Sequence, residues 1–165
     1  MDTENLAAVC GLFCGACEFF RAGQDHTLPK RQEFLQRVAA RLGYLALDSF
    51  RCDGCLGQGH LTPWCRNCEI KLCPALQFGM TRCSDCPDFP CSRVSNFNDD
   101  GMQHHAEVLK NLRRFKEIGV NNWAKQEEER WRCPQCGNSF AWYDRSCFHC
   151  GTKRPERLFP LPQPD

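Results

Sequence analysis

Cysteine is the residue that most constrains this chain. It occurs fifteen times in 165 residues, and most of these cysteines stand in CxxC pairs. Two residues between cysteines let both sulfurs converge on one ion from a tight turn, so paired CxxC units are typical of metal sites in a reducing compartment. The pairs are Cys14/Cys17, Cys52/Cys55, Cys65/Cys68, Cys83/Cys86, Cys133/Cys136 and Cys147/Cys150.

A disulfide scaffold is the alternative for a chain so rich in cysteine. The odd cysteine count argues against it, and the N-terminal residues lack the basic segment, apolar stretch and cleavage site of a secretory signal. A thioredoxin-like redox pair would need a βαβ pattern around one CxxC, which the sequence does not show. We therefore expect a cytoplasmic protein whose reduced thiols bind metal.

Composition limits both the hydrophobic core and the partners. Hydrophobic residues make up 42% of the chain with the cysteines included, so few ordinary core side chains remain. Each structural zinc ion can supply ~10–16 kcal/mol of folding free energy in their place. The formal net charge of +1 argues against bulk electrostatic binding to nucleic acid or membranes. No apolar run approaches the ~18 residues of a membrane span.

Helical patterns separate the cysteine-rich stretches. Apolar residues recur at helical spacing over 29–43 and 102–118, and a shorter helix is expected over 121–131, with the glutamates of 127–129 on a solvated face. These patterns predict a small, irregular, metal-stapled α+β protein. We expect a cysteine-rich knuckle domain over 1–97, a helical connector over 98–130, a zinc ribbon over 131–152 and a Pro-rich tail over 153–165.

The C-terminal units CPQCG and CFHCG form the most specific motif. The spacer between them suits a short hairpin over 139–143, and the Pro and Gly residues shape two knuckles. The motif predicts a closed four-thiolate zinc site, which has no open position for water and is therefore structural rather than catalytic. Iron also accepts this geometry. The predicted ligands are Cys133, Cys136, Cys147 and Cys150.

The N-terminal cysteines do not divide evenly into four-thiolate sites. Their spacing groups Cys52, Cys55, Cys65 and Cys68 in one site, although neighbouring cysteines can interleave instead. A further site is closed by Cys73, Cys83, Cys86 and Cys91. With the ribbon this makes about three zinc ions. Three thiols are then left over in a Cx3Cx2C run, namely Cys10, Cys14 and Cys17.

The leftover run has several interpretations. In the first, the three thiols hold an iron–sulfur cluster. In the second, His26 or His60 completes them as a Cys3His site. In the third, Cys10 is a core thiol and the other two cysteines join an interleaved site. Radical-SAM enzymes share the Cx3Cx2C spacing, but their partial barrel needs far more residues than this chain has.

Aromatic and histidine side chains add weaker indications. His104, His105 and His149 are expected to be solvated or exposed. Tryptophans beside a ribbon can stack on nucleic-acid bases, or they can cover metal sites and add core area. The sequence contains no Ser/His/Asp arrangement, P-loop or dinucleotide fingerprint. The four tryptophans are Trp64, Trp123, Trp131 and Trp142.

The N-terminal cysteine motifs, taken together, resemble those of one family. CGLFCGAC, CDGC, WCRNCEIKLC and CSDCPDFPC follow one another within residues 8–97. This order resembles a cysteine-rich bacterial and archaeal domain-of-unknown-function family (thirty-seven ninety-five), with the pattern CGLxCxxC, CxGC, CxxCxIxxC and CxxCxxxPC. The resemblance implies a small, cytoplasmic, zinc-binding protein and no particular activity. Because the family is frequent in anaerobes, it also favours iron–sulfur chemistry.

These observations favour a non-enzymatic, multi-zinc interaction or regulatory module with an unidentified protein partner. Two alternatives come from other classes of protein. One is an iron–sulfur protein for redox or sensing, with its cluster on Cys10, Cys14 and Cys17. The other is a nucleic-acid-binding adaptor built on the ribbon.

Overall fold

The computed structural model describes residues 3–25, 28–41, 43, 51–77 and 79–161. Its regular structure is helical. The longer helices are α1 (Glu18–Gln24), α2 (Pro29–Arg41), α5 (Ser92–Asn98), α6 (Val108–Ile118) and α7 (Val120–Trp131). Short helical turns are η1 (Thr3–Leu6), η2 (Cys14–Ala16), α3 (Pro63–Arg66), α4 (Pro74–Gln77), η4 (Cys83–Asp85) and η5 (His105–Glu107).

Extended pairing is sparse in this part of the chain, so the β component of the expected α+β fold is small. The hairpin expected over 139–143 is not formed as a strand ladder. The backbone N–H of Phe140 donates to the carbonyl of Trp131 (2.9 Å), and that of Trp142 donates to the carbonyl of Ala16 (2.7 Å). Among the described residues, the extended pairing consists of three isolated β-bridges, which join Ala7 to Phe13, Arg132 to Ser139 and Ser146 to Lys153.

The predicted helices are present, and one is shorter than expected. Helix α2 begins at Pro29 as its pattern indicates, and α7 covers the expected 121–131. The expected helix over 102–118 becomes α6 only at Val108, because the residues before it form the separate turn η5. Gly119 joins α6 to α7 with φ of +79°, a left-handed conformation that glycine adopts at little cost.

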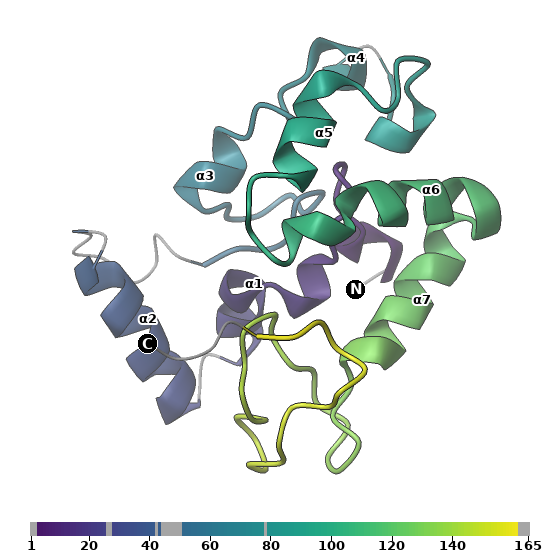
Figure 1. Cartoon of the computed structure of the whole chain (residues 1–165). Coiled ribbons are helices and arrows are strands. Elements are labelled where there is room, and N and C mark those ends of the chain that lie inside the picture. Colours follow the sequence, from purple (N-terminus) through teal and green to yellow (C-terminus); the bar gives the residue numbers. More distant parts are fainter. Residues whose placement is uncertain (1–2, 26–27, 42, 44–50, 78, 162–165) are drawn as a thin grey trace.

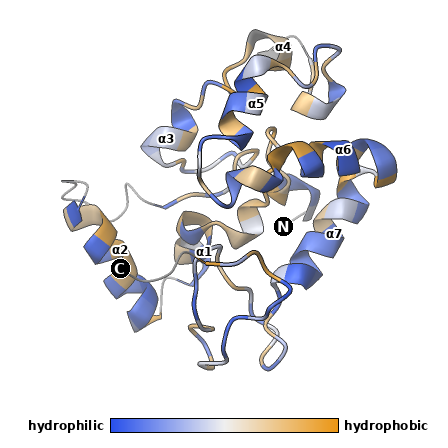
Figure 2. Ribbon diagram, in the orientation of Figure 1, coloured by the Kyte–Doolittle hydropathy of each residue, from blue (hydrophilic) through white to orange (hydrophobic). Residues whose placement is uncertain are grey.

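The N-terminal segment lies in the middle of the molecule (Figure 1). Helices α3, α4 and α5 lie on one side of it, α6 and α7 on another, α2 on a third, and the C-terminal loops close the remaining side. Figure 2 shows that α2 and α6 each carry hydrophilic and hydrophobic residues, as expected of helices that bury one face. The N-terminal segment is therefore enclosed by elements from the rest of the chain.

Tryptophan supplies much of the main hydrophobic core. Trp123 packs edge-on against Phe13 and Phe115, with ring centroids 6.0 and 4.7 Å away. Trp131 and Trp142 are buried as well, 1% and 9% exposed. Three of the four tryptophans thus add core area rather than a stacking surface for bases, and Trp64 is the exposed one.

The core takes residues from each stretch between the predicted domain boundaries. It combines Val94 from α5, Leu112 from α6, Phe140 from the C-terminal loops and Leu158 from the Pro-rich tail. The boundaries at 97, 130 and 152 stay a prediction. No helix in the described part of the chain is long and apolar enough to cross a membrane.

Part of the glutamate run in α7 is buried, contrary to the expectation of a solvated face. Glu127 is 8% exposed and accepts a hydrogen bond from the indole Nε1 of Trp131 (3.0 Å). Arg130 also donates to its carboxylate (3.3 Å). The buried indole four residues later needs an acceptor, and this requirement draws Glu127 inward.

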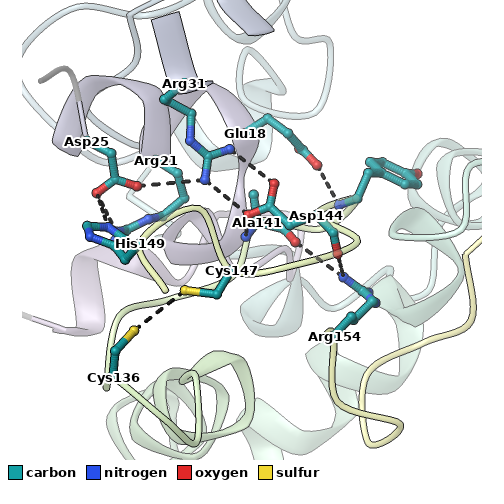
Figure 3. A network of polar contacts seen from close by, with 11 residues as sticks. Glu18, Arg21, Asp25, Arg31, Cys136, Ala141, Asp144, Cys147, His149 and Arg154 are labelled. Atoms are coloured by element: carbon teal, nitrogen blue, oxygen red, sulfur yellow. Dashed lines mark hydrogen bonds and ion pairs between the residues drawn. The ribbon is translucent and has the colours of Figure 1, made fainter. Parts of the chain in front are cut away.

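A buried ion pair attaches the C-terminal loops to α2 (Figure 3). The guanidinium of Arg31 is 1% exposed and donates to both carboxylate oxygens of Asp144, at 3.2 and 3.0 Å. Asp25 lies 3.7 Å from the same guanidinium. The ring of Phe148 packs beneath it, 4.1 Å from the guanidinium carbon. The pair therefore joins residues that are far apart in the sequence.

Replacement of Asp144 by Ala should lower the free energy of unfolding by roughly 3–5 kcal/mol, because it removes the bidentate partner of a buried cation. Chemical denaturation of the metal-loaded protein, followed by circular dichroism, measures the loss. The matched control is Glu117→Ala, which breaks the exposed Arg114–Glu117 pair (2.7 Å) and should cost less than about 1 kcal/mol. Equal losses in the two variants would show that the buried pair does not hold the loops.

Candidate metal centre

Two backbone knuckles present the C-terminal cysteines. In the first, the N–H of Cys133 donates to the carbonyl of Asn138 (2.7 Å), and the N–H of Gly137 donates to the carbonyl of Cys133 (3.0 Å). Gly137 adopts φ of +76°, which favours glycine at the end of the knuckle. The same two bonds recur in the second knuckle, each at 2.8 Å, among Cys147, Thr152 and Gly151.

The knuckles bring four sulfurs to one point. All four lie within 4.8 Å of one another. The Sγ atoms of Cys133 and Cys150 are 3.6 Å apart. Those of Cys136 and Cys147, which Figure 3 shows, are 3.5 Å apart. These separations exceed the ~2.05 Å of a disulfide. Four thiolates at ~2.3 Å from a tetrahedral zinc ion lie ~3.8 Å apart, so the arrangement fits one such ion.

Side chains next to the sulfurs favour the thiolate form at the exposed positions. The hydroxyl of Thr152 lies 3.2 Å from the Cys150 sulfur. Hydrogen bonds from this hydroxyl and from the backbone N–H of Thr152 together lower the pKa of Cys150 to about 6. The backbone and the amide of Asn138 lower the pKa of Cys136 in the same way. Burial raises the pKa of Cys147 to about 12, so a metal ion has to displace its proton.

The N-terminal cysteines surround a cavity instead of a point. The cavity has a volume of about 810 Å³. Its lining also includes aromatic and imidazole side chains, among them Phe19, Trp64, His104, Trp142 and Tyr143. The cysteines that line the cavity are Cys10, Cys14, Cys17, Cys52, Cys55, Cys65 and Cys68.

Contacts among these thiols connect different CxxC units. Cys65 shares a hydrogen bond with Cys52, which lowers the pKa of Cys52 to about 6. The backbone N–H of Cys55 donates to the sulfur of Cys14 (3.4 Å). Burial raises the pKa of Cys10, and the neighbouring thiol of Cys55 raises it further. The leftover Cx3Cx2C run therefore shares one cavity with the two central CxxC units.

The remaining predicted group surrounds Cys83. Burial raises the pKa of Cys83 to about 12, and the thiols of Cys91, Cys73 and Cys86 are its neighbours. This proximity agrees with the predicted grouping of these four cysteines, which stays a prediction. The predicted grouping of Cys52 with Cys55, Cys65 and Cys68 also stays a prediction. Among the described residues, only the four C-terminal cysteines bring three or more such ligand atoms within 4.8 Å of one another.

Of the two histidines proposed as the fourth ligand of the leftover run, His60 and His26, the structure describes only His60. His60 is exposed, and its backbone N–H donates to the carboxylate of Asp53 (2.8 Å). His26 lies outside the described residues. The Cys3His interpretation of the leftover run therefore receives no support from His60.

His104 is a cavity residue that sequence reasoning placed in solvent. Its ring stacks on Trp142, with centroids 4.0 Å apart, and its Nδ1 lies 2.7 Å from the hydroxyl of Tyr143. Burial lowers the pKa of His104 to about 3, so the imidazole is neutral. The expectation of a solvated His104 was wrong because its partners lie far along the chain, where no local pattern indicates them.

Glu18 lies between the cavity and the C-terminal loops. Its Oε1 accepts a hydrogen bond from the backbone N–H of Tyr143 (2.7 Å), and the residue is 7% exposed. Burial raises the pKa of this carboxyl from 4.5 to about 7. Because the folded state holds this proton more tightly than the unfolded state, the carboxyl destabilises the fold increasingly as the pH rises through this range.

Glu18→Gln should remove this pH dependence. The destabilisation is absent below pH 4.5, grows as the pH rises towards 7 and reaches roughly 3 kcal/mol above it. The amide keeps an acceptor for the Tyr143 N–H and carries no charge at any pH, so the variant should exceed the parent in stability above neutral pH. Urea unfolding at acidic and alkaline pH measures the difference, with Glu33→Gln on exposed α2 surface as control. Identical pH profiles for Glu18→Gln and the parent would contradict the assignment.

Comparison with known proteins identifies the N-terminal part. No curated protein and no solved structure matches the chain. The profile of the family described as "Protein of unknown function (DUF3795)" matches residues 6–96, more than half of the chain. The matched stretch contains the cavity cysteines and ends before α6, α7 and the two knuckles. The chain therefore belongs to the DUF3795 family, as its N-terminal cysteine motifs indicated.

Proposed function

We propose that this chain is a non-enzymatic metal-binding protein in which a structural zinc ion fastens the C-terminal loops to the cysteine-rich domain. The observation that carries the proposal is the gathering of four sulfurs within 4.8 Å by two matched knuckles. A closed four-thiolate site leaves no coordination position for water or substrate, so its contribution is to folding. The ligands are Cys133, Cys136, Cys147 and Cys150.

The loop between the knuckles explains what the ion stabilises. Phe140 and Ala141 are fully buried at its apex, and Trp142 lines the N-terminal cavity. An ion that ties the two ends of this loop together reduces the conformational entropy lost when its apex enters the core.

The group around Cys83 is proposed as a second zinc site of the same kind. Such a protein would serve as a cytoplasmic interaction or regulatory module.

The nucleic-acid alternative has less support. A small cleft between α6 and α7 is lined by basic residues, including Lys110, Arg114 and Arg130. Arg114 is paired with Glu117, and Arg130 with Glu107 and Glu127. These carboxylates offset most of the positive charge that phosphate binding requires.

Cys147→Ser should lose one zinc ion per chain and unfold the C-terminal loops, because it removes a buried ligand from a four-thiolate site. Elemental analysis of protein purified without oxygen gives the metal content, and tryptophan fluorescence reports the loops. Gln135→Ser changes an exposed residue of the first knuckle and should keep the full zinc content. Unchanged zinc in Cys147→Ser would contradict the proposed centre, and iron at this site would replace zinc in the proposal.

Thr152→Val should weaken zinc binding roughly 10–100-fold, since removal of a hydrogen-bond partner next to a metal ligand typically has this effect. The valine keeps the shape of the side chain and removes the hydroxyl that contacts the Cys150 sulfur. Competition with a chromophoric chelator measures the affinity. Thr81→Val, which removes a hydroxyl bonded to Asp85 (2.9 Å), is the matched control. Equal affinities in these two variants would exclude a role for the Thr152 hydroxyl.

A further inference from the structure

The cavity thiols differ from the knuckle thiols in how they are spaced. Seven cysteines from three separate segments line the cavity, yet among the described residues no three of them meet within 4.8 Å. A single zinc ion needs its thiolates drawn together to such distances. The cavity therefore presents thiols that surround a space, whereas the knuckles present thiols that converge on an ion.

The size of that space favours a larger inorganic group. About 810 Å³ is within the range of pockets for whole ligands and far exceeds what one ion occupies. A zinc–thiolate cluster uses cysteine sulfurs as its bridges and so keeps them close together. An iron–sulfur cluster contains its own bridging sulfide, which fills the space between its irons and holds the cysteine sulfurs apart.

We propose that the cavity binds an iron–sulfur cluster through Cys10, Cys14, Cys55 and Cys68. The assignment rests on the proposed metal-binding function but uses other cysteines than the structural zinc centre. Of the seven cavity cysteines, Cys10 and Cys14 are buried in one hydrophobic cluster, and the partly buried Cys55 and Cys68 pack against that cluster. Cys55 and Cys68 are also neighbours of each other. These four thus form a connected set within the cavity wall.

Backbone N–H groups are already directed at three of these sulfurs. Leu12 donates to Cys10, Cys55 donates to Cys14 and Val9 donates to Cys55. Such hydrogen bonds stabilise cluster thiolates and set the reduction potential of the cluster. They come from the backbone, so they are fixed by the fold and do not depend on a mobile side chain.

The rest of the cavity wall suits a group that has to be kept from water. Phe20 and Ile70 are each 4% exposed, and Trp142 is 9% exposed. A hydrophobic shell of this kind controls solvent access to a metal site and its reduction potential. Cys17, Cys52 and Cys65 line the same cavity, and Cys52 and Cys65 share a hydrogen bond with each other.

The test is reconstitution of the full chain without oxygen, using ferrous iron and sulfide with the zinc sites already loaded. Iron and acid-labile sulfide should be incorporated in equal amounts, with a broad absorption band near ~400 nm. Cys14→Ser should lose most of the iron, the sulfide and the band. Gln135→Ser and Glu117→Ala change exposed residues outside the cavity and outside every proposed metal site, so both variants should keep all three.

Alkylation of the parent protein keeps the proposal testable if Cys14→Ser does not fold. Loading with iron and sulfide should protect Cys10, Cys14, Cys55 and Cys68 from alkylation, as mapped by mass spectrometry. Protection of the group around Cys83 instead, or zinc without sulfide in the cavity, would overturn the cluster. Zinc bound at the knuckles together with no iron anywhere would overturn only the cluster. Absence of zinc from the knuckles would overturn the proposed function instead.

Discussion

The structure depends on the contacts that attach the loop between the knuckles to η2, to the start of α1 and to α2. Arg31 and Asp144 form the buried ion pair of this attachment, and Glu18 accepts the backbone N–H of Tyr143. The backbone N–H of Trp142 completes it with a bond to the carbonyl of Ala16. Because Trp142 and Tyr143 also line the cavity, the same contacts that fasten the loop build one cavity wall. A segment outside the family match thus completes a site within it.

Spacing and burial give the same residue type two different chemistries in this chain. Cys136 and Cys150 are exposed beside hydrogen-bond donors, and their pKa values are lowered. Cys10 and Cys14 are buried among other thiols, and their pKa values are raised. In the proposed zinc centre, these two exposed thiols lose their protons to a cation more readily than the buried thiol of Cys147. The second arrangement, that of Cys10 and Cys14, favours neutral thiols until a group with its own strong positive charge displaces their protons.

The sequence predicted those features that depend on residues close together in the chain. The spacing and glycines of the C-terminal motif were enough to predict the four-sulfur group, and helical periodicity located α2 and α6. The positions of His104, Glu18 and Arg31 could not be predicted, because their partners lie 39, 125 and 113 residues away. The grouping of the N-terminal cysteines depends on the same kind of distant contact. Their spacings allowed several assignments, and only the fold shows which thiols share a cavity.

The buried charges give a physical reason for a stabilising metal ion in the C-terminal loops. Arg31, Asp144 and Glu18 are removed from water at a cost that their mutual contacts only partly offset, and Glu18 adds a further cost once it ionises. The proposed zinc ion at the two knuckles would supply folding free energy beside this polar contact. In the proposed function, the zinc centre therefore holds the cavity wall formed by Trp142 and Tyr143 while it lies outside the cavity itself.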